Sequence, residues 1–104
     1  MHKVTNLKDS IYVEVLTSPN CVHSPRAMKI ARGLARKRKN MVLMEVSIAT
    51  EQGMERAKEF DAKATPAIAV NGRLVYVGVP SPEDFESIVA REAANEKERT
   101  SYYF

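Results

Sequence analysis

From residue 11 onward, hydrophobic and polar residues alternate along the chain. Residues 11–17 place apolar side chains at every second position, which predicts a strand with one buried face. Between residues 27 and 38 the apolar spacing changes to three or four, the pattern of an amphipathic helix. Residues 41–48 form another apolar run and predict a second strand. This order of strand, helix and strand indicates a parallel pair joined by a crossover helix.

A capping residue starts the next element. Thr50 suits the N-cap of a short helix that extends to Phe60, because its hydroxyl can accept a hydrogen bond from the first helical turn. Met54 and Ala57 are expected to face the core from this helix.

The second half of the chain carries a hairpin and a last helix. Residues 67–70 and 73–77 flank Asn71-Gly72, a strong hairpin signal because both turn residues adopt positive φ angles in a type I′ turn. Ser81-Pro82 fits the N-cap and first position of a helix. We expect that helix to end near residue 94.

These elements predict an α/β protein with a mixed four-stranded sheet flanked by helices. The 104 residues suffice for one domain with its own core, with residues 1–9 as an irregular lead-in and residues 95–104 as a frayed tail. No apolar run approaches the length of a membrane span, and the first residues lack a signal-peptide pattern. With one cysteine and no internal disulfide, we expect a cytoplasmic protein without a membrane partner. The sequence does not indicate an oligomeric state.

The net charge is only +3, but the positive charge is concentrated. Every charged residue between Arg26 and Lys39 is Lys or Arg. Such a patch suits nucleic acid, but cations also gather near helix C-termini, where the helix dipole favours them. No aromatic residues are interleaved for base stacking. We therefore favour a solvated helix face over a nucleic-acid site, and an anionic protein partner stays open.

The single cysteine, Cys21, lies between the first strand and the first helix. Free backbone N–H groups and the dipole of a helix N-terminus favour the thiolate, which is the nucleophile in disulfide chemistry. A lone cysteine is also commonly a small buried hydrophobic residue, so both interpretations stay open. His23 would lower the thiol pKa if protonated, or is an exposed loop residue without a role. One cysteine and two histidines give no basis for a metal site.

Three polar residues allow further expectations. Ser24 fits the N-cap of the first helix, with a proline after it. Glu14 and Glu45 interrupt apolar strands. Glu14 is either an internal proton carrier near the cysteine or an exposed residue. Because unpaired buried carboxylates are rare, we expect the exposed position.

A nucleophilic cysteine after the first strand, together with Thr65-Pro66 before the hairpin, resembles the thioredoxin/glutaredoxin superfamily. The likeness covers residues 11–90 and is nearest to small glutaredoxin-like members. It implies a thioredoxin fold with three helices and the sheet order 4-3-1-2, in which strand 3 is antiparallel to the others. It also implies that Cys21 attacks, that Thr65-Pro66 is a cis bond, and that these two residues align an extended substrate.

The chain departs from that family at Ser24, where dithiol members have a second cysteine. A hydroxyl cannot resolve a mixed disulfide, and sequence does not separate a natural serine from an engineered one. A motif for iron–sulfur clusters is absent, and the usual Gly-Gly turn for glutathione is incomplete. We therefore expect a thiol–disulfide oxidoreductase without a cofactor that acts through Cys21 on a disulfide or thiol protein. It follows a monothiol route, or it is a dithiol enzyme whose resolving cysteine is replaced by Ser24. Glutathione or another small thiol stays open as the reductant. The alternative is a non-enzymatic protein-binding module with the same fold.

Overall fold

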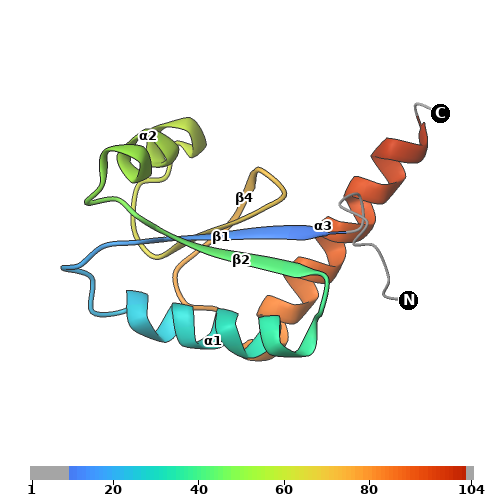
Figure 1. The fold of residues 1–104 in the computed structure, drawn as a ribbon, viewed down its shortest axis with the longest axis horizontal. Coiled ribbons are helices and arrows are strands. Elements are labelled where there is room, and N and C mark those ends of the chain that lie inside the picture. The colour runs from blue at the N-terminus through green and yellow to red at the C-terminus, as the bar shows by residue number, and fades with distance from the viewer. Residues whose placement is uncertain (1–9, 103–104) are drawn as a thin grey trace, which may run out of the picture.

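The computed structural model describes the backbone of residues 10–102 and the side chains of residues 10–95, so the predicted lead-in of residues 1–9 lies outside the described part. Figure 1 shows the order of elements, which is β1 (Ile11–Thr17), α1 (Ser24–Lys37), β2 (Met41–Ser47), α2 (Glu51–Phe60), β3 (Ala67–Val70), β4 (Arg73–Val77) and α3 (Pro82–Tyr102). Within residues 10–102, no helix is long and apolar enough to cross a membrane.

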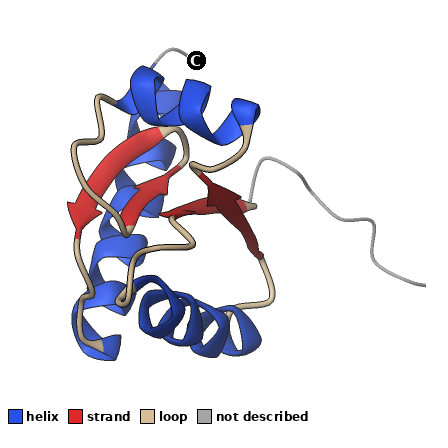
Figure 2. Cartoon of the chain, turned by 90° about the vertical axis from the view of Figure 1, so that its left-hand side faces the viewer, coloured by secondary structure: helices blue, strands red, loops and turns tan. Residues whose placement is uncertain are grey.

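The strands form one sheet in the order β2-β1-β3-β4. Strand β1 pairs in parallel with β2 and antiparallel with β3, and β3 is antiparallel to β4. The predicted mixed sheet and its single reversed strand are therefore confirmed. Figure 2 shows helices on both sides of the strands. This is the expected thioredoxin fold.

Alternation along β1 divides its side chains between two cores. Val13 and Val15 are fully buried in a core shared with α1 and α3, whereas Leu16 belongs to a smaller core shared with α2. Helices α1 and α3 thus cover one face of the sheet, and α2 covers the other (Figure 1). The carboxyl end of β1 leads directly to the loop before α1. This loop therefore lies where the central strand β1 ends.

Helix α2 starts as predicted, but its buried face differs from the prediction. The Thr50 hydroxyl accepts a hydrogen bond from the backbone N–H of Gly53 at 2.9 Å, which confirms the N-cap. Ala57 is buried, but Met54 is 45% exposed, so its predicted inward position is wrong. The helix approaches β2 through its small residues, since any Cβ on Gly53 would overlap the carbonyl group of Ser47.

The hairpin is confirmed, with positive φ angles of 51° at Asn71 and 82° at Gly72. The cap of α3 is also confirmed, because the Ser81 hydroxyl accepts from the backbone N–H of Asp84 at 3.1 Å. The predicted end of this helix near residue 94 is wrong, and the expected frayed tail is helical as far as Tyr102. Residues 95–102 contain no Gly or Pro and include Glu, Lys and Arg, which favour helix.

Candidate active site

Cys21 lies in the tight loop that joins β1 to α1. Its backbone N–H donates to the carbonyl of Ser18 at 3.0 Å, and its own carbonyl accepts from the N–H of Ser24 at 3.3 Å. These turns hold the sulfur at the start of α1. The thiol is only partly buried, so Cys21 is not the small core residue that formed the alternative interpretation.

Ser24 is not the N-cap of α1. The cap is His23, and Ser24 is the first helical residue, followed by a proline in the first turn. The Ser24 side chain is buried, and its hydroxyl accepts from the backbone N–H of Ser18 at 3.2 Å. The prediction is wrong because this hydroxyl binds the preceding loop rather than the first turn of its own helix.

Thr65 and Pro66 lie beside the sulfur although they are far away in sequence. The Thr65-Pro66 peptide bond is cis. In the protonated thiol, the Cys21 Sγ donates to the carbonyl oxygen of Thr65 at 3.3 Å. The Pro66 carbonyl in turn accepts from the N–H of Gly78 at 2.8 Å, which ties this corner to the end of β4. Two of the predicted site residues, Thr65 and Pro66, are therefore next to a third, Cys21.

The environment of Cys21 lowers its pKa to about 7. The main cause is a hydrogen bond from the Ser24 side chain, followed by one from the Thr65 side chain. The backbone N–H groups of His23 and Ser24 add smaller effects in the same direction, and partial burial opposes them. A donor that points at sulfur stabilises the thiolate more than the thiol. A pKa near 7 makes a large fraction of Cys21 nucleophilic at neutral pH.

His23 contributes through its backbone. Its N–H is among the groups that lower the Cys21 pKa, and its side chain is exposed. A tuning role for the imidazole itself stays a prediction.

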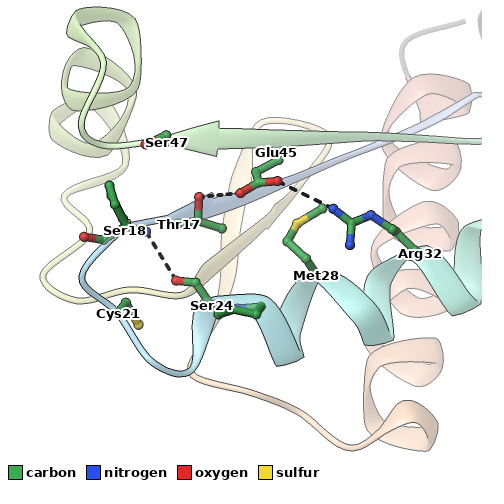
Figure 3. Close-up of a pocket in the computed structure, with 10 residues that line it drawn as sticks. Thr17, Ser18, Cys21, Ser24, Met28, Arg32, Glu45 and Ser47 are labelled. Carbon is green, nitrogen blue, oxygen red and sulfur yellow. Dashed lines mark hydrogen bonds and ion pairs between the residues drawn. The ribbon is translucent and has the colours of Figure 1, made fainter.

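A pocket of about 440 Å³ lies beside Cys21, between the ends of β1 and β2 and the start of α1. Figure 3 shows Ser24 and Glu45 at its wall. The Glu45 carboxylate accepts from the Thr17 hydroxyl at 2.9 Å and is 3.7 Å from the guanidinium of Arg32. Neither the pocket nor the position of Arg32 in its wall was predicted from the sequence. The one signal in the sequence was Glu45, a carboxylate within an apolar strand.

Glu14 is not exposed as predicted. It lies on the opposite face of the sheet from the pocket and is only 7% exposed. Arg56 on α2 donates to both of its carboxylate oxygens, at 2.7 and 2.8 Å. The carboxylate raises the pKa of Arg56 above its usual range. The prediction failed because the compensating charge comes from a helix 42 residues further along the chain.

The described residues contain no cluster of three or more His, Cys, Asp or Glu side chains suited to a metal ion. The reactive group that the geometry identifies is the Cys21 sulfur, with the hydrogen-bond donors around it.

Comparison with known proteins gives consistent likenesses. The thioredoxin domain family matches residues 11–90. A probable thioredoxin from Methanothermobacter thermautotrophicus is 35% identical over 80 residues, which cover 75% of this chain and 92% of that protein. A thioredoxin from Methanocaldococcus jannaschii is 30% identical over 73 residues, or 70% of this chain and 85% of that protein.

Two solved structures share the fold. A protein disulfide oxidoreductase from Aeropyrum pernix K1 superposes with a TM-score of 0.69 at 28% identity, over 86% of this chain. This chain spans only 41% of that longer protein. Mitochondrial thioredoxin 3 from Saccharomyces cerevisiae superposes with a TM-score of 0.66 at 16% identity, over 82% of each chain.

Proposed function

The chain belongs to the thioredoxin family, and we propose that it is a thiol–disulfide oxidoreductase that works through Cys21 alone. The observation that carries this proposal is the position of the Cys21 sulfur, 3.3 Å from the Thr65 carbonyl and with a pKa lowered to about 7. A nucleophilic sulfur beside a stretch of backbone suits exchange with an extended substrate that contains a disulfide.

In the first step the Cys21 thiolate attacks one sulfur of a substrate disulfide. The substrate S–S bond breaks, a bond forms between Cys21 and the attacked sulfur, and the other sulfur leaves with the electron pair as a thiolate. Thr65 and Pro66 align the substrate chain beside Cys21. The hydrogen bonds from Ser24 and Thr65 that stabilise the free thiolate lower its nucleophilicity somewhat, but they increase the fraction that is ionised.

The second step requires a thiol from outside this chain, because Cys21 is the only cysteine in its sequence. An external thiolate attacks the mixed disulfide and releases the bound substrate sulfur, and a second equivalent regenerates the Cys21 thiol. The two electrons come from the two external thiols, which leave joined as a disulfide. Glutathione is one small thiol of this class. A cytoplasmic location would supply it in reduced form.

Ser24 supports the first step and cannot perform the second. It occupies the place at which dithiol relatives would have the resolving cysteine, and its hydroxyl helps to stabilise the Cys21 thiolate. This monothiol route resembles that of small glutaredoxin-like proteins. No metal or organic cofactor takes part in either step.

The test is to incubate the protein with glutathione disulfide and follow its mass. We expect one glutathione to be added to the wild type and removed by excess reduced glutathione, and no addition to Cys21→Ser. The matched gain-of-function variant is Ser24→Cys, which should form an internal disulfide and release the adduct without added thiol.

A wild type that forms no adduct with glutathione disulfide or with a peptide disulfide would overturn the redox proposal. That result would favour the alternative of a thioredoxin-fold protein-binding module without turnover.

A further inference from the structure

The exposed side of α1 carries five basic residues and no acidic one. Its positively charged residues recur at spacings of three and four, so they share one face of the helix. We call this the basic face, and it consists of Arg26, Lys29, Arg32, Arg36 and Lys37, all of them exposed. The opposite side of α1 is buried in the core through Ala27, Met28, Ala31 and Leu34. The basic face therefore points away from the sheet, toward solvent.

The basic face begins beside the reactive sulfur. Helix α1 starts three residues after Cys21 and has 14 residues, so the face extends for about 21 Å from the site at about 1.5 Å per residue. Figure 1 shows α1 along one outer side of the molecule, opposite α2. A macromolecule that places a disulfide on Cys21 would also lie within reach of this charge.

The fold makes little use of this charge. Within residues 10–95, Arg32 is the one member of the basic face with an acidic partner, and that ion pair with Glu45 is half-exposed at 3.7 Å. Elsewhere in the same part of the chain, Arg56 and Lys63 bind acids at 2.7 and 2.9 Å. The other charges of the basic face are free to act on a partner.

The positive charge near the start of α1 is opposite to the charge that a helix N-terminus favours. A helix N-terminus favours acidic side chains, and both α2 and α3 have acids in the first turn. Helix α1 has none there and carries Arg26 instead. Helix stability therefore does not account for positive charge at this end, which is the end next to Cys21.

The residue next to the sulfur is apolar. Val22 is 82% exposed, and Pro19 and Pro25 on either side are exposed as well. An apolar centre with a charged rim is the usual composition of a protein–protein contact. Nucleic acid would match the charge but has no disulfide to offer to Cys21.

We propose that the basic face selects protein substrates whose reactive disulfide is surrounded by acidic residues. This inference rests on the proposed function and adds the class of substrate. Attraction between the two surfaces raises the rate of encounter, and salt weakens the attraction because it screens charge. The exchange step at sulfur is the same for every substrate, so the selection lies in the association.

The experiment measures the rate at which Cys21 forms a mixed disulfide with three peptides. The peptides share one disulfide core and differ only in flanking residues, which are Glu, Gln or Lys. Each rate is measured at about 10 mM and about 1 M salt, where the Debye length falls from about 30 Å to about 3 Å. We expect the wild type to prefer the Glu peptide over the Lys peptide by about tenfold at low salt and not at high salt.

Charge reversal locates the effect. Arg36→Glu with Lys37→Glu changes the end of the basic face that is farthest from Cys21, and should abolish or invert the preference. The matched control is Lys58→Glu with Arg73→Glu, which makes the same change of net charge on α2 and β4 and should keep the preference. Alkylation by neutral iodoacetamide measures the thiol itself in each variant, so damage to the Cys21 loop is detected separately.

Three outcomes would overturn the inference. Equal rates of the wild type with all three peptides would remove the basis for selection. An equal loss of preference in the control variant would show that net charge, and not the basic face, is responsible. Tighter binding of a DNA or RNA oligonucleotide than of the Glu peptide would assign the face to nucleic acid. Failure to react with any peptide would instead overturn the proposed function.

Discussion

Helices α1 and α2 lie on opposite faces of one sheet and use their arginines in opposite ways. On α2, Arg56 binds the buried Glu14 through two hydrogen bonds, and its guanidinium lies 4.4 Å from the ring centre of Phe60. On α1, Arg26 and Arg36 are exposed. Charge on the α2 side holds a helix to the sheet, whereas charge on the α1 side stays at the surface, next to the thiol.

The two glutamates of the sheet show the same contrast. The side chain of Glu14 is 9% exposed and that of Glu45 is 46% exposed. An ion pair that is removed from water depends on both partners, because the loss of one leaves a buried charge without compensation. Breaking a half-exposed ion pair costs the protein little stability, since water replaces the lost partner. The α2 pair should therefore matter to stability and the α1 pair should not.

The largest effect is expected from Arg56→Met. This substitution leaves the Glu14 carboxylate buried without its partner, and it should lower the free energy of unfolding by about 3 kcal/mol. This value is at the low end for buried ion pairs because the Arg56 side chain is itself 36% exposed. Urea denaturation measures the change. Alkylation of Cys21 should remain as in the wild type wherever the variant is folded.

The control for Arg56→Met removes both charges. Glu14→Gln combined with Arg56→Met should recover most of the lost stability, because no uncompensated carboxylate remains. A loss below about 1 kcal/mol in the single variant would show that water reaches Glu14, and the two faces would then not differ as described.

An intermediate effect is expected from Ser24→Ala, on the α1 side. Removing the hydroxyl takes away the main hydrogen bond that lowers the Cys21 pKa. The pKa should rise from about 7 toward the ordinary cysteine value of about 8.5, and alkylation at pH 7 should slow by about fivefold. The matched control is Ser87→Ala on the exposed surface of α3. An unchanged pH midpoint in Ser24→Ala would show that the hydroxyl does not act on the sulfur.

The smallest effect is expected from Glu45→Gln. The amide keeps an acceptor for the Thr17 hydroxyl and loses only the half-exposed ion pair with Arg32. The free energy of unfolding should fall by less than about 1 kcal/mol in the same urea assay. A loss as large as that of Arg56→Met would remove the distinction between the two glutamates.

Local signals in the sequence were sufficient for most of the fold. Asn71-Gly72, Thr50 and Ser81 each act on backbone groups within three residues, so their effect is readable without the rest of the chain. The end of α3 was misplaced because the chain there has no stop signal and continues as helix. Met54 was misplaced because α2 packs through Gly53 and Ala57 instead.

The site was only partly predictable, for a physical reason. The position of Cys21 follows from its neighbours in sequence, but the Thr65 carbonyl is 44 residues away and enters only through the family resemblance. Glu14 was assigned to the surface because nothing near it in sequence offers a partner. Ser24 was assigned to a cap because a serine before a proline is a common helix start. Its actual hydrogen bond with Ser18 depends on how the loop closes, which the local sequence does not show.

The most direct test of the account is the pH dependence of Cys21 alkylation in the wild-type protein. Only the thiolate reacts, so the rate follows ionisation and rises with pH. We expect the rate to reach half of its maximum near pH 7, because Ser24 and Thr65 stabilise the thiolate. A midpoint at about 8.5, the value of an unperturbed cysteine, would contradict it.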